Sequence, residues 1–90
     1  MKTLAEIKAE AEAFDGVYSA NIWKDRRVYV NFFGYDRSFA GCRNLKVYYD
    51  IKTGWQFEGD KGTYPSEFIA NARAFAEHVG LRNSRGGSPF

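Results

Sequence analysis

The segment VYVNFFGYD, residues 28–36, carries apolar or aromatic side chains in both of its alternating sets of positions. Successive side chains of a β-strand point to opposite faces of the sheet, so Val28 and Val30 lie on one face and Tyr29 and Phe33 on the other. A strand with one solvated face would instead alternate apolar and polar residues. The segment therefore predicts a strand with contacts on both faces, and the second face needs something to cover it.

The flanking segments predict two helices and three more strands. TLAE at 3–6 is a capping box, and the apolar stripe after it predicts a helix over 3–14. A second stripe after PSEF predicts a helix that ends at Gly80 in a Schellman motif, with Leu81 folding back. Strands are expected over 17–23, 27–35 and 44–51, and from Trp55 to Glu58.

The length of the turn after Trp23 decides which residues of the first two strands share a face. With a three-residue turn, the side chains on the apolar face are Tyr18, Ala20, Ile22, Val28, Val30 and Phe32. With a four-residue turn, the first strand would instead contribute Ser19, Asn21 and Trp23. We favour the shorter turn because it leaves one face fully apolar.

A second hairpin is predicted at KTG, residues 52–54, where Gly54 supplies the positive φ that a three-residue loop with a bulge requires. This turn pairs Ile51 with Trp55 and Tyr49 with Phe57 on the apolar face.

Together these elements predict an α+β fold of order α-β-β-β-β-α. It is a four-stranded antiparallel meander with an N-terminal and a C-terminal helix packed on one face, in two layers. Ninety residues allow one domain, which we place at 1–81, followed by a flexible basic tail at 82–90.

The opposite face is then left without cover from the chain. Its predicted binding residues are Trp23, Arg27, Tyr29, Asn31, Phe33, Tyr35, Lys46 and Tyr48, with Arg37 and Arg43 at the edge and Phe39 in the loop. Aromatic rings interspersed with cations are typical of surfaces that bind single-stranded nucleic acid. Bases would stack on Tyr29, Phe33 and Tyr48. Phosphates would contact Arg27, Arg37, Arg43 and Lys46.

Three alternatives share the same residues. Tyr, Trp, Phe and Arg are enriched at protein interfaces, so the face could dock one specific protein, as a small inhibitor or adaptor of phage or mobile-element type would. It could also form a homodimer, or the first helix could cross to it and bury Tyr29 and Phe33. The net charge of +2 does not by itself predict nucleic-acid binding, and Asp25, Asp36, Asp50 and Glu58 oppose a phosphate track.

Two families resemble this order of elements. Helix, antiparallel strands and helix resembles the double-stranded RNA-binding domain, whose last helix begins with lysines; PSEF here has Glu67 instead. RRVYVNF followed by LKVYYDI is similar to the PUR-type repeat, in which four strands precede a helix and the sheet binds single strands. Both resemblances imply nucleic acid as the partner.

No pattern in the sequence indicates an enzyme, a cofactor or a metal site. His78 lies in the last turn of the second helix, where the helix dipole favours an exposed cation. Cys42 is a single cysteine, interpreted as a loop residue. Neither a signal peptide nor a membrane-spanning run is recognised, so the expected location is the cytoplasm.

Overall fold

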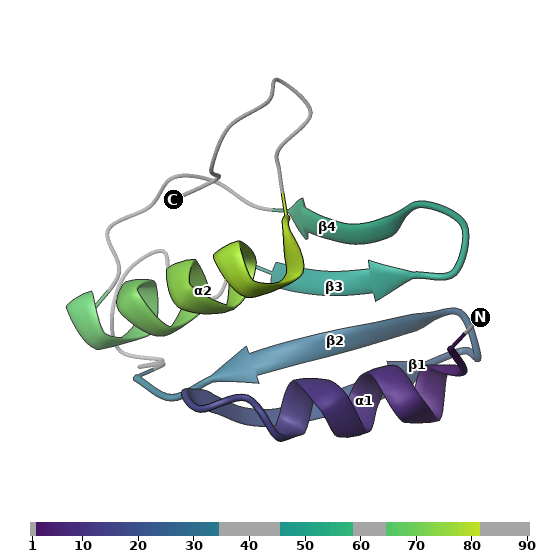
Figure 1. Ribbon diagram of the computed structural model, residues 1–90, viewed down its shortest axis with the longest axis horizontal. Coiled ribbons are helices and arrows are strands. Elements are labelled where there is room, and N and C mark those ends of the chain that lie inside the picture. Colours follow the sequence, from purple (N-terminus) through teal and green to yellow (C-terminus); the bar gives the residue numbers. More distant parts are fainter. Residues whose placement is uncertain (1, 35–45, 59–64, 82–90) are drawn as a thin grey trace.

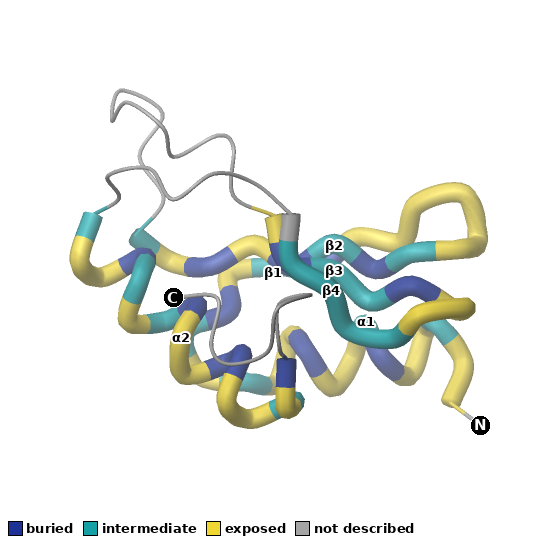
Figure 2. Tube along the Cα trace, turned by 90° about the horizontal axis from the view of Figure 1, so that it is seen from above, coloured by how far each residue is buried: buried dark blue, intermediate teal, exposed yellow. Residues whose placement is uncertain are grey.

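The computed structural model describes residues 2–34, 46–58 and 65–81. Its elements are α1 (Leu4–Glu12), β1 (Val17–Trp23), β2 (Arg27–Phe32), β3 (Lys46–Asp50), β4 (Gly54–Glu58) and α2 (Ser66–Val79). The strands form one antiparallel sheet in the order β1-β2-β3-β4. Both helices lie on the same side of this sheet (Figure 1), and the view from above shows the sheet and the helices as two layers (Figure 2). The predicted α+β meander is confirmed.

The helix α1 begins at the predicted capping box. The Thr3 hydroxyl accepts from the Glu6 backbone N–H at 3.1 Å, and the Glu6 carboxylate accepts from the Thr3 N–H at 3.3 Å. Ile7 and Ala11 are buried against the sheet. Glu12 reaches the edge strand β1, where its carboxylate accepts from the Ala20 N–H at 3.2 Å. A charged side chain thus caps a backbone donor at this edge of the sheet.

The helix α2 supplies Phe75, the largest of the described side chains that are almost completely buried. Phe75 is buried and meets the rings of Phe14, Phe32 and Trp55 at 5.3, 5.6 and 5.0 Å between centroids. The helix ends as predicted, because the Leu81 N–H donates to the Ala76 carbonyl at 2.8 Å and Leu81 is buried.

The turn between β1 and β2 has the predicted three residues, 24–26. Lys24 and Asp25 both have a φ of 50°, and the Arg26 N–H donates to the Trp23 carbonyl at 3.0 Å. Ile22 then pairs with Val28 on the face that the helices cover.

Tyr18, however, does not join the apolar face, so that part of the prediction is wrong. The β1–β2 register shifts between Val17 and Ser19, which is a β-bulge at Tyr18. Val17 therefore pairs with Phe32 in the core, and Tyr18 is 68% exposed.

The predicted pairing of β3 with β4 is also wrong, by two residues. Asp50 pairs with Gly54 and Tyr49 with Trp55, so Ile51 lies in the turn and is 50% exposed. The turn begins earlier because the Asp50 carboxylate accepts from the Lys52 N–H at 2.8 Å, a local bond that Asp commonly makes in turns. Because the shift is even, the side chains that remain in the two strands, such as Tyr49 and Trp55, keep their predicted face.

Candidate binding surface

The face of the sheet opposite the helices is called the open face below. The strand register places on it Ser19, Asn21, Trp23, Arg27, Tyr29, Asn31, Lys46, Tyr48, Asp50 and Gln56. The helix α1 packs on the other face, so the alternative in which it crosses over to bury Tyr29 is wrong. Trp23 is 44% exposed, while Tyr29 and Tyr48 are half-buried beside one another.

A cluster of four side chains surrounds Arg27 at the hairpin end of this face. The Arg27 guanidinium carbon lies 4.5 Å from the centre of the Tyr48 ring and 5.9 Å from that of Trp23. Its Nη1 donates to the Tyr29 hydroxyl at 3.0 Å, and its Nε donates to the Asp50 carboxylate at 2.9 Å. Trp23, Arg27, Tyr29, Tyr48 and Asp50 form the arginine cluster.

Asp50 is the carboxylate that holds Arg27 in this cluster. It is 2% exposed, and its carboxylate accepts from the Lys52 backbone N–H, from Arg27, and from Arg26 Nε at 3.3 Å. These donors lower the pKa of Asp50 to about 2, and the Lys52 N–H makes the largest contribution. The Tyr29 hydroxyl and the Asp50 carboxylate in turn raise the pKa of Arg27, so the pair stays ionised.

The low pKa of Asp50 predicts a loss of stability in acid. A carboxyl group whose pKa is depressed in the folded state stabilises the fold above its unfolded pKa, and this contribution is lost as pH falls through the folded pKa. We expect the stability advantage of the wild type over Asp50→Asn to shrink as pH falls from about 3.8 to about 2. Urea unfolding of both proteins across this range measures it. A difference that does not change with pH would contradict the ionised pair.

A second aromatic pair lies at the open end of the β1–β2 hairpin, away from its turn. The Tyr18 and Phe33 rings meet edge to face, with centroids 5.3 Å apart, and Phe33 is 49% exposed. The sequence pattern assigned Tyr18 to the core because an unbroken alternation along β1 was assumed. The β-bulge in the structure breaks this alternation and places Val17 in the core in place of Tyr18.

The structure brings only part of the predicted site together. Trp23, Arg27, Tyr29 and Tyr48 form one cluster, and the Asn31 amide donates to the Ser19 hydroxyl at 3.1 Å beside it. Lys46 is exposed at the far end of β3. Four predicted residues lie outside the described part of the chain: Tyr35, Arg37, Phe39 and Arg43.

Among the described residues, no group of three or more His, Cys, Asp or Glu side chains is placed to hold a metal ion. Neither of the two described helices is long and apolar enough to span a membrane. Comparisons of the chain with protein-family models, with curated proteins and with solved structures gave no match.

Proposed function

We propose that the protein is a non-catalytic binding module that docks one specific protein partner through the open face. The face combines rigid rings with short polar side chains, Ser19, Asn21 and Asn31, that can adapt their hydrogen bonds. Tyr, Trp, Arg, Ser and Asn make up the surfaces by which proteins commonly recognise other proteins. The Tyr18–Phe33 pair extends the aromatic area beyond the arginine cluster.

The observation that carries this choice is the ion pair between Arg27 and Asp50. A phosphate-binding arginine needs a charge that the protein has not already neutralised. Arg27 is engaged by a buried carboxylate at 2.9 Å and by the Tyr29 hydroxyl at 3.0 Å, so a phosphate would have to compete with both. A preorganised cluster of Trp, Tyr and an arginine that is already paired instead suits a protein interface, where such residues dominate the binding energy.

Single-stranded nucleic acid is the second candidate, because two lysines beside the rings remain outside the Arg27–Asp50 pair. Lys24 Nζ lies 4.8 Å from the centre of the Trp23 ring, and Lys46 is exposed on β3. Bases on the rings with phosphates on these lysines would reproduce the usual arrangement of single-strand binding surfaces. Such binding must weaken steeply as salt increases, whereas protein docking on the aromatic rings of the arginine cluster should respond less.

We expect a tagged form of the protein to retain one stoichiometric partner from an extract of the cells that make it. Trp23→Ala should abolish this retention, since truncation of a central aromatic anchor commonly costs at least 2 kcal/mol of binding energy, or about 30-fold in affinity. Quantitative affinity capture at low and at high salt measures the effect.

Ile51→Ala is the matched control, because Ile51 is about as exposed as Trp23 but lies in the β3–β4 turn outside the open face. Ile51→Ala should leave capture unchanged.

Titration with a single-stranded oligonucleotide tests the second candidate, with Lys46→Ala compared against Arg73→Ala on α2. Salt-dependent oligonucleotide binding that Lys46→Ala weakens and Arg73→Ala does not would replace the protein partner by nucleic acid. Doubled mass in light scattering, lost in Trp23→Ala, would replace it by a homodimer.

A further inference from the structure

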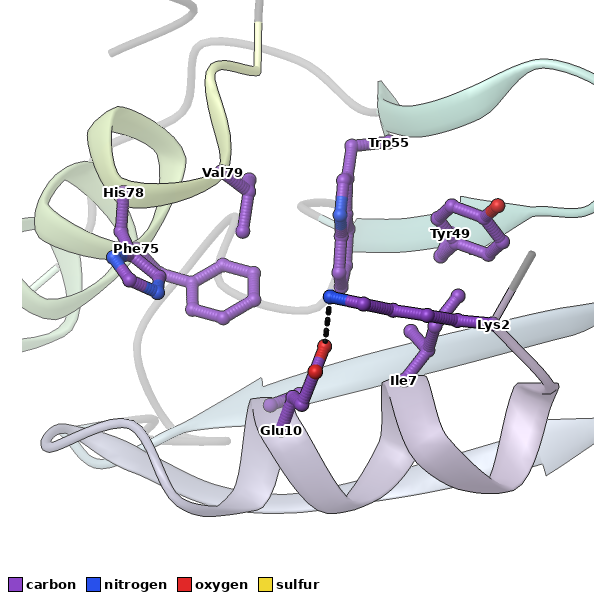
Figure 3. Close-up of a pocket in the computed structure, with 9 residues that line it drawn as sticks. Lys2, Ile7, Glu10, Tyr49, Trp55, Phe75, His78 and Val79 are labelled. Atoms are coloured by element: carbon purple, nitrogen blue, oxygen red, sulfur yellow. Dashed lines mark hydrogen bonds and ion pairs between the residues drawn. The ribbon is translucent and has the colours of Figure 1, made fainter.

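A pocket of about 490 Å³ lies on the helix side of the sheet, away from the open face (Figure 3). It is an open pocket between α1, the last turns of α2 and the β3–β4 hairpin. The pocket exists because α1 packs on β1 and β2, which leaves Tyr49 and Trp55 of the hairpin only partly covered. Its volume is typical of sites that enclose small organic molecules.

The inner wall of the pocket is aromatic. Trp55 lies between Phe75 and Tyr49, with ring centroids 5.0 and 5.5 Å away and ring planes at 79° and 70° to its own. Ile7 and Val79 complete this wall from the two helices. A flat apolar ring is the kind of group that such a wall would bury favourably.

The polar side chains that line the pocket are Lys2, Glu10, Tyr49, Trp55 and His78. Lys2 and Trp55 can only donate hydrogen bonds, and Tyr49 and His78 can donate or accept. Lys2 Nζ donates to the Glu10 carboxylate at 2.9 Å, and this bond raises the pKa of Lys2, so the ammonium stays charged. Trp55 also lines the pocket, and its indole N–H donates to no other described residue. Glu10 is the carboxylate of the lining, and Lys2 already occupies it. An acceptor group on a ligand would therefore find donors in Lys2 and in the Trp55 indole.

We propose that this pocket binds a small aromatic carboxylic acid, with its ring against Trp55 and its carboxylate on Lys2. The ligand carboxylate would replace Glu10 as the partner of the Lys2 ammonium, whose exposed position allows the exchange. An ammonium ligand would have to displace the Lys2 ammonium from Glu10 and would then lie beside it as a like charge. An aromatic ligand without a charged group would gain only the contacts with the apolar wall. This inference does not depend on the function of the open face.

The test is a titration of the full chain with three probes that share one skeleton: 3-phenylpropionate, 3-phenylpropanol and 3-phenylpropylamine. Each is followed by the NMR shift of the Trp55 indole N–H, with the Trp23 indole on the open face as internal reference. We expect 3-phenylpropionate to shift Trp55 and not Trp23, and to bind roughly fivefold more tightly than the alcohol. The amine should bind most weakly.

Two variants separate the carboxylate contact from simple packing. Glu10→Gln removes the competitor for Lys2 and should tighten 3-phenylpropionate binding by roughly fivefold, while Lys2→Gln should reduce it to the level of the alcohol. Lys8→Gln is the control, because Lys8 forms a similar pair with Glu12 on the same helix but does not line the pocket. Equal binding of the three probes, tighter binding of the amine, or no shift of Trp55 with any of them would overturn the proposal.

Discussion

Replacing Phe75 by alanine should lower the free energy of unfolding by about 3–5 kcal/mol, the usual cost of removing a buried phenylalanine ring. Phe75 is 1% exposed and contacts three rings: Phe14 before β1, Phe32 of β2 and Trp55 of β4. Its loss leaves a cavity where the two layers meet. Since domains of this size are stable by only about 5–10 kcal/mol, the variant should be partly unfolded near body temperature. Urea denaturation followed by circular dichroism measures the change.

Phe33→Ala is the control for this prediction. The same side chain is removed, but Phe33 is 49% exposed and its ring meets that of Tyr18, itself on the surface. We expect a loss of less than about 1 kcal/mol. Similar losses for the two variants would mean that the ring of Phe33 is buried in solution, and the aromatic area of the proposed docking surface would then be smaller than the structure gives.

The parts of the fold that the sequence predicts well are those that neighbouring residues determine. The capping box at Thr3 and Glu6, the apolar stripe of α2 and the left-handed end at Gly80 each lie within one or two turns of helix. The sidedness of the sheet also follows from local alternation, together with the limited area that two helices can cover. These features were sufficient to predict the open face.

What could not be predicted depends on contacts between distant residues. Asp50 and Arg27 are 23 positions apart, and their bond is made only after β2 and β3 pair. That bond changes the chemistry of the surface, because it pairs Arg27, which the sequence pattern assigned to a phosphate, with a carboxylate of the protein. The bulge at Tyr18 likewise places Val17 opposite Phe32, a register that the alternation of β1 alone does not reveal.

The packing of the N-terminus of α2 against the end of β2 depends on a close approach at Gly34. Its φ is 93°, which side chains rarely adopt, and a Cβ there would lie 2.6 Å from the backbone nitrogen of Phe68 at the start of α2. Gly34→Ala should therefore destabilise the fold by roughly 2–4 kcal/mol, as backbone strain and a steric overlap add together. The overlap is with main chain, so no side-chain rotation relieves it.

Gly54→Ala measures the cost of backbone strain without a steric overlap. Gly54 has a φ of 81°, and a Cβ at this position would meet no atom within 4 Å beyond its chain neighbours, so its substitution should cost only about 1–2 kcal/mol. Urea unfolding of the two variants gives the difference directly, and that difference measures how tightly α2 sits on the end of β2. If both substitutions cost the same, the N-terminus of α2 does not approach Gly34 in solution, and the packing of α2 on the sheet would have to be reconsidered.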